Sequence, residues 1–106
     1  MRKGFVVRKY FSQAFREIRL QSKQPAGVPM KSPEMEALRK AHLECLDKLK
    51  AEGKLFCSGP MADWSCALDI YHVDSIEEVE KLLKSDPFAK HNIFIRNEIE
   101  AWYQSF

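Results

Sequence analysis

Segments with strand periodicity and segments with helix periodicity alternate along the chain, and this alternation limits the possible folds more than any other feature. Residues 4–11 and 65–73 place apolar side chains at every second position, which predicts strands. Residues 33–52 and 75–86 instead repeat apolar side chains at spacings of three and four, which predicts amphipathic helices. Two further strand-like segments complete the predicted order βαββαβ.

The ends of both helices carry recognisable capping residues. Ser32 is a plausible N-cap for the first helix, and Gly53 can adopt the left-handed conformation that closes its last turn. Ser75, with Glu78 three residues later, has the spacing of a capping box at the start of the second helix. Pro87 ends that helix because it cannot continue the hydrogen-bond ladder.

The two remaining strands are shorter or less regular. We expect one at 54–58, ended by Gly59-Pro60 and followed by a turn at 61–64, and one at 92–102. The last strand is expected to turn its isoleucines toward the helices: Ile93, Ile95 and Ile99.

Two helices in this order cover one face of a four-stranded antiparallel sheet, so the predicted fold is α+β and ferredoxin-like. The length of 106 residues suits a single domain over residues 1–106. The opposite face of the sheet also carries large side chains, Phe94 and Trp102 among them. We therefore expect a second copy to cover it in a symmetric homodimer.

Composition excludes several classes of protein. A membrane span needs about 20 apolar residues, and no apolar run in the chain comes close to that length. The chain also has no apolar segment typical of a secretory signal. Its three cysteines include no Cys-x-x-Cys pair, so we expect reduced thiols, no disulfide framework, no metal knuckle and a cytoplasmic location.

Basic residues gather at the N-terminal end. Residues 1–31 hold eight Lys or Arg and one acidic residue. They could solvate the outer face of a strand and a loop, contact nucleic acid, or form a transit peptide, and the first interpretation is the commonest. Residues 12–32, with a Pro- and Gly-rich part at 22–33, are expected to form a long loop that could cover a binding site, unless the first strand continues past a bulge.

His42 and Asp86 are the first candidates for chemistry. His42 lies on the apolar stripe of the first helix, where a polar ring needs a partner, and Asp86 ends the second helix just before a proline. Because both helices lie on one face of the sheet, Asp86 could orient His42 as an acid–base group. Two alternatives remain open: a buried structural pair, or a metal site that also includes Cys45.

Two motifs give the chain a family resemblance. The run His42-Leu43-x-x-Leu46-x-x-Leu49-x-x-x-Gly53-x-Leu55-x-x-x-Gly59-Pro60, followed by Asp86-Pro87-Phe88, resembles the signature of the YciI-like (YCII-related) family. The resemblance covers about residues 36–106, and residues 1–35 match only as one strand and a long basic loop. The turn at 61–64 lacks the glycines often found there, Asn92 replaces a common glycine, and His91 is unusual.

The resemblance implies a ferredoxin-like subunit in a dimeric α+β barrel, with His42 and Asp86 as a catalytic pair in a pocket. It implies no metal and no organic cofactor. Ser58, Gly59, Pro60 and Phe88 are the candidate substrate-binding residues; a strand-end serine such as Ser58 can also serve only the backbone.

We therefore expect a cofactor-independent enzyme of acid–base, lyase or dehalogenase type that acts on a small cyclic or aromatic molecule, either neutral or anionic. The alternative function is a non-catalytic dimeric module that binds a ligand or is purely structural. Neither a membrane nor a nucleic acid is an expected partner.

Overall fold

A computed structural model describes residues 1–22, 27 and 29–106. Along these residues the chain forms β1 (Arg2–Phe11), α1 (Gln13–Ser22), α2 (Pro33–Ala51), β2 (Leu55–Pro60), β3 (Cys66–Tyr71), α3 (Ile76–Ser85), α4 (Pro87–Lys90) and β4 (Phe94–Gln104). No helix within the described residues is long and apolar enough to cross a bilayer.

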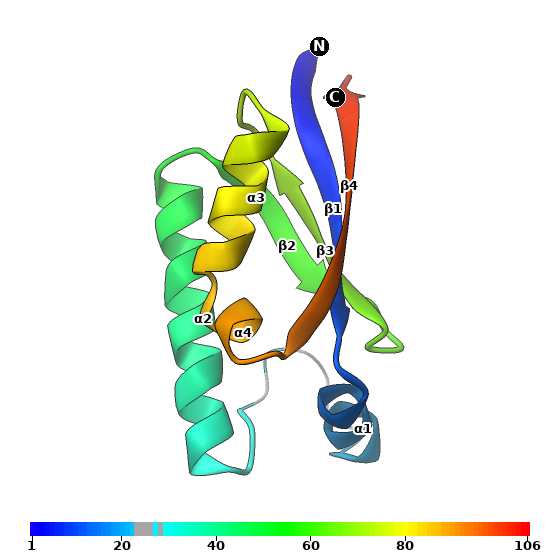
Figure 1. The fold of residues 1–106 in the computed structure, drawn as a ribbon, viewed down its shortest axis with the longest axis vertical. Coiled ribbons are helices and arrows are strands. Elements are labelled where there is room, and N and C mark those ends of the chain that lie inside the picture. The colour runs from blue at the N-terminus through cyan, green and yellow to red at the C-terminus, as the bar shows by residue number, and fades with distance from the viewer. Residues whose placement is uncertain (23–26, 28) are drawn as a thin grey trace.

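The strands form one antiparallel sheet in the order β2-β3-β1-β4. Helices α2 and α3 lie side by side over one face of this sheet, and both chain termini lie at the same end of the molecule (Figure 1). One of the two inner strands, β1, pairs Val7 with Asp69 of β3 on one side and with Ile99 of β4 on the other. The predicted ferredoxin-like fold is confirmed.

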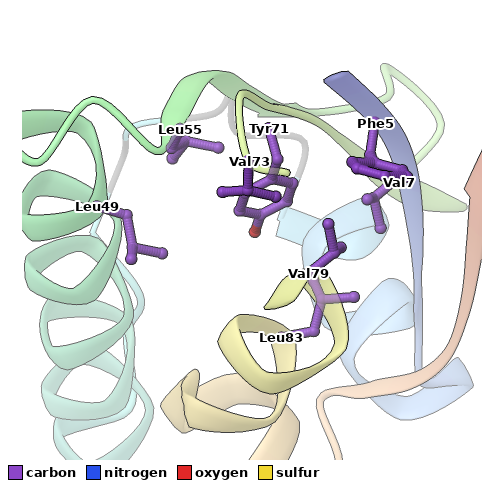
Figure 2. Close-up of a cluster of buried hydrophobic side chains, with 8 residues drawn as sticks. All are labelled: Phe5, Val7, Leu49, Leu55, Tyr71, Val73, Val79 and Leu83. Atoms are coloured by element: carbon purple, nitrogen blue, oxygen red, sulfur yellow. The ribbon is translucent and has the colours of Figure 1, made fainter. Parts of the chain in front are cut away.

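Side chains from both helices and the sheet form the main core (Figure 2). Leu49 of α2 and Val79 and Leu83 of α3 are buried against the helix-facing side of the sheet. Burying each side chain of this size contributes roughly 1.5–3 kcal/mol, and this anchors both helices. The sheet and its flanking loops supply the other members of this core: Phe5, Val7, Leu55, Tyr71 and Val73.

The predicted helix ends are confirmed. The Ser32 side chain accepts a hydrogen bond from the Met35 N–H, and the Ser75 side chain accepts one from the Glu78 N–H. Each such cap typically stabilises a helix by about 1 kcal/mol. Gly53, at φ +76°, takes the left-handed conformation after α2.

The interpretation of residues 12–32 as a loop or extended strand was wrong for its first half. Residues 13–22 form α1, which begins where the Ser12 side chain accepts a hydrogen bond from the Phe15 N–H at 3.2 Å. Phe15 and Arg19, one turn apart, are the buried side chains of this helix. Residues 23–26 and 28, part of the predicted Pro- and Gly-rich loop, lie outside the described residues.

Two strands differ from their predicted limits. β2 continues through Gly59 and Pro60, because Pro60 still pairs with Ala67 across from it. β4 shows the larger difference: Phe94 is buried and Ile95 is 64% exposed, although the sequence pattern predicts that Ile95 faces the helices. The pairing of β1 with β4 shifts between Tyr10 and Phe11, and such an irregularity reverses which residues face the core.

The outer-face interpretation of the basic N-terminal residues was also wrong at two positions. Lys9 is 2% exposed and Arg19 is 4% exposed. Lys9 lies on the helix-facing side of β1 together with Val7 and Phe11, since the three alternate along the strand.

Gly4 provides a test of the sheet packing. A Cβ atom at this position would lie 2.4 Å from the Tyr71 carbonyl oxygen of the neighbouring strand, so β1 and β3 would have to separate. We expect Gly4→Ala to lower the free energy of unfolding by about 1–3 kcal/mol, as overpacking does elsewhere. Urea denaturation measures this loss. Gly59→Ala is the matched control, because no atom lies within 4 Å of its Cβ position; equal stability of the two variants would contradict the packing.

Candidate active site

His42 and Asp86 meet on the helix side of the sheet although they are far apart in sequence. The Nδ1 atom of His42, in the middle of α2, lies 2.8 Å from each carboxylate oxygen of Asp86. Both residues are buried, with 8% of His42 and 4% of Asp86 exposed. Since an ionised carboxylate only accepts, Nδ1 is the donor, and the neutral ring carries its lone pair on Nε2.

The local sequence holds Asp86 in place. Pro87 disfavours helical geometry at the residue before it, and Asp86 is extended at φ −69° and ψ 128°. Asp86 thus ends α3 and caps α4, where its Oδ1 atom accepts a hydrogen bond from the Phe88 N–H at 2.9 Å. The Asp86-Pro87-Phe88 sequence therefore orients the carboxylate toward α2.

Two aromatic rings fix the imidazole of His42. Phe88 stacks on it with centroids 4.1 Å apart and planes 2° from parallel. Phe94 meets it edge to face, with a centroid distance of 5.7 Å and an angle of 67°. The bond of Nδ1 to Asp86 and the two ring contacts together restrict the orientation of the imidazole.

A cavity of about 120 Å³ adjoins His42. Five aromatic side chains line it: Phe11, Phe15, Trp64, Phe88 and Phe94. Ser58, Gly59 and Pro60 of β2 also line it, as does Leu43, which is 40% exposed. No Lys, Arg, Asp or Glu is among its described lining residues. The structure thus brings His42 and all four candidate substrate-binding residues to one apolar cavity, while Asp86 lies behind His42.

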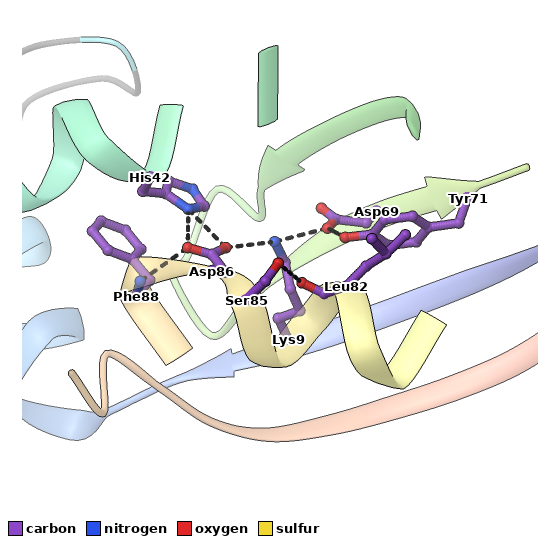
Figure 3. A network of polar contacts seen from close by, with 8 residues as sticks. All are labelled: Lys9, His42, Asp69, Tyr71, Leu82, Ser85, Asp86 and Phe88. Atoms are coloured by element: carbon purple, nitrogen blue, oxygen red, sulfur yellow. Dashed lines mark hydrogen bonds and ion pairs between the residues drawn. The ribbon is translucent and has the colours of Figure 1, made fainter. Parts of the chain in front are cut away.

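Behind Asp86 lies a second polar layer that the sequence analysis missed (Figure 3). Lys9 Nζ lies 2.7 Å from Asp69 Oδ2 and 4.0 Å from Asp86 Oδ2. The Tyr71 hydroxyl donates to Asp69 Oδ2 at 2.7 Å. Burial and the neighbouring Asp69 raise the pKa of Tyr71, so its hydroxyl remains a donor.

A sequence signal for this layer existed. Lys9 occupies the strand face of Val7 and Phe11, and Asp69 occupies the face of Ala67 and Tyr71. A charged residue flanked by apolar ones on a buried face is expected to have a buried partner of opposite charge.

The other candidate groups lie elsewhere. His72 Nε2 pairs with the Gln104 side chain at 2.7 Å, and His91 is exposed and does not line the cavity. Cys45 is half-buried, and burial raises the pKa of its thiol. Within the described part of the chain, no group of three His, Cys, Asp or Glu side chains is arranged to hold a metal ion, so the site weighed for His42, Cys45 and Asp86 has no geometric support.

A larger open hollow of about 910 Å³ lies at the other end of the sheet, between both chain termini and the start of β2. It is lined in part by Arg2, Phe56 and Phe106, and it includes neither His42 nor Asp86. The smaller aromatic cavity is therefore the one that reaches the polar pair, through His42.

Comparison with solved structures places this architecture among known folds. The 5-chloro-2-hydroxyhydroquinone dehydrochlorinase of Burkholderia phenoliruptrix, solved in complex with 2,5-dihydroxybenzoquinone, superposes with a TM-score of 0.65 at 22% sequence identity. The match covers 96% of this chain and 95% of that one, which establishes a shared fold. Comparison with curated proteins gave no match.

Sequence comparison identifies the family. The profile of the YCII-related domain matches residues 17–103, which include α2, the Asp86-Pro87-Phe88 sequence and most of the sheet. The chain belongs to the YCII-related domain family.

Proposed function

We propose that this protein is a cofactor-independent enzyme in which His42 moves a proton at Nε2 on a small cyclic substrate. The observation that carries the proposal is the contact of His42 Nδ1 with Asp86 at 2.8 Å beside an aromatic cavity that His42 itself lines. A carboxylate behind a histidine fixes its tautomer and stabilises the imidazolium that forms when Nε2 takes a proton.

The lining of the cavity supports a planar ring as substrate. Its aromatic walls offer stacking surfaces, and its volume of about 120 Å³ is on the scale of a cavity that holds one six-membered ring. The Ser58 hydroxyl can hydrogen-bond a ring substituent at the edge of the cavity.

The proposed reaction is an elimination that needs no oxidant. In the keto tautomer of a chlorinated hydroxyquinol, where the chlorine-bearing carbon is tetrahedral, Nε2 accepts the proton of a ring hydroxyl. The O–H electrons form a carbonyl, the adjoining ring double bond shifts to the chlorine-bearing carbon, and chloride departs with the electron pair of the carbon–chlorine bond. The structural relative is named a dehydrochlorinase and was solved with a planar quinone, and both facts support this reaction class. In this chain the role of Asp86 is to hold the proton on Nδ1, so that Nε2 is the nitrogen that faces the substrate.

Replacement of His42 tests the proposal. His42→Gln keeps a side-chain N–H near Asp86 but has no nitrogen that titrates near neutral pH. We expect chloride release from 5-chloro-2-hydroxyhydroquinone to fall about 10²–10⁴-fold, the usual contribution of a positioned acid–base group. His91→Gln, which changes an exposed histidine outside the cavity, should keep wild-type turnover.

The alternative function gives the opposite result. If the pair is a structural element of a ligand-binding module, the wild-type protein will bind 2,5-dihydroxybenzoquinone without turning over any ring substrate. His42→Gln will then cost about 1–3 kcal/mol of stability through an imperfectly paired Asp86. Undiminished turnover in His42→Gln would end the catalytic proposal.

We also propose that two copies associate through the sheet face opposite the helices. Val6, Ile70 and Trp102 lie on this face and are half-buried in the isolated chain. The face also carries the ion pair Arg8–Glu100, at 3.0 Å. Its mixture of apolar side chains with both signs of charge suits self-association about a two-fold axis.

Solution mass tests the dimer. Ile70→Glu places a charge at the centre of the proposed interface, so light scattering should give the mass of one chain where the wild type gives two. Ile76→Glu, at the exposed start of α3 on the other side of the molecule, is the matched control and should stay dimeric. A monomeric wild-type protein would contradict the proposed association.

A further inference from the structure

Lys9 is a buried cation that lies close to the proposed catalytic pair but outside the cavity. Its side chain is 2% exposed, and Lys9 is not among the residues that line the cavity. Figure 3 shows its ammonium group between the carboxylates of Asp69 and Asp86. Lys9 therefore cannot touch a substrate there, and any effect on chemistry must pass through Asp86.

Stability alone is a weak reason for this arrangement. Moving a lysine and two aspartates out of water carries a large desolvation cost, and apolar side chains of similar volume usually give equal or greater stability. The sheet around Lys9 is otherwise filled by apolar residues such as Val7, Phe11 and Ala67. A charged group at this position therefore indicates a role in the neighbouring polar site.

The distances show which of the two carboxylates is the close partner of the Lys9 ammonium. Lys9 Nζ lies 2.7 Å from Asp69 and 4.0 Å from Asp86, so Asp69 is its close partner. The Tyr71 hydroxyl holds the same Asp69 oxygen at 2.7 Å. Asp86 is thereby left to bond His42 through both of its oxygens. The Lys9 ammonium, 4.0 Å from Asp86 Oδ2, still compensates part of the negative charge of Asp86.

One ring connects the two halves of the network. Lys9 Nζ lies 4.5 Å from the centroid of Phe94, and the same ring packs edge to face against His42. Cation–π attraction holds the ammonium over the ring, which limits its movement toward Asp86. The positions of Lys9, Asp86 and His42 are thus coupled through contacts on both sides.

We propose that Lys9, restrained by Asp69, is a positioning residue that keeps Asp86 turned toward His42 Nδ1. Its importance for turnover rests on the proposed function, whereas its effect on the geometry of the pair does not. Removal of the restraint should let the carboxylate rotate away from His42, either toward a released Lys9 or freely when Lys9 is absent.

Two variants test this proposal. Asp69→Asn keeps an oxygen acceptor but leaves Asp86 as the nearby carboxylate for Lys9, so Asp86 should turn toward the ammonium. Lys9→Met with Asp69→Asn removes one positive and one negative charge together, so the net charge of the buried network stays the same. The exposed Lys3→Met, on the same strand, is the matched control.

The first readout is the NMR resonance of the His42 Nδ1 proton in ligand-free protein, which reports the bond to Asp86 without any need for turnover. In both variants we expect this resonance to shift or broaden away, and Lys3→Met to leave it in place. Where turnover is measurable, kcat should fall about 10–100-fold with little change in KM, the usual effect of a residue that orients a functional ligand.

The possible results separate the positioning role of Lys9 from the proposed function. A wild-type resonance and a wild-type kcat in whichever variant folds would overturn the positioning role while the proposed function stands. A shifted resonance in a protein whose turnover survives His42→Gln would support the positioning role and overturn the proposed function. Because the two variants alter the charges differently, either one alone decides if the other fails to fold.

Discussion

The bond between Asp86 and His42 is the interaction on which the candidate site depends. It joins α2 to the junction of α3 and α4, and the same carboxylate caps α4 through the Phe88 N–H. Phe88 in turn stacks on His42, so one aspartate fixes both the tautomer and the plane of the imidazole. A short sequence, Asp86-Pro87-Phe88, thus builds most of the polar site from local backbone geometry.

The site has an aromatic cavity on one side of His42 and buried charges on the other. The cavity in front of His42 is lined by aromatic rings, and the buried charges of Lys9, Asp69 and Asp86 all lie behind the histidine. In a medium of low polarity such charges act strongly over short distances, so their balance matters for the proton that His42 carries. The division suits chemistry on a planar ring with a single side chain as proton carrier.

Sequence reasoning was strongest where a structural feature is local. The caps at Ser32 and Ser75 and the left-handed Gly53 follow from residues within one helical turn. The meeting of His42 with Asp86 needed the topology and the family resemblance, because nothing local joins them across the fold. Asn92, at φ +58°, adopts the conformation that its replacement of a family glycine requires.

The failures involve interactions across the sheet or buried charges. The shifted pairing between Tyr10 and Phe11 reverses the exposure of Phe94 and Ile95, and the sequence of β4 alone does not contain that register. α1 was missed because one of its buried positions is Arg19, which breaks the apolar pattern of the helix. Lys9 was assigned to solvent because a lone lysine is usually exposed, and Asp69 becomes its partner only when β1 and β3 pair.

The most direct test of the central claim is a crystal structure of the protein with 2,5-dihydroxybenzoquinone bound. The account predicts the ring in the aromatic cavity, with one of its oxygens about 2.6–3.2 Å from His42 Nε2, within reach for proton transfer. A ligand bound only in the open hollow near the chain termini, or a ring in the cavity whose oxygens all lie beyond hydrogen-bond distance of Nε2, would contradict it.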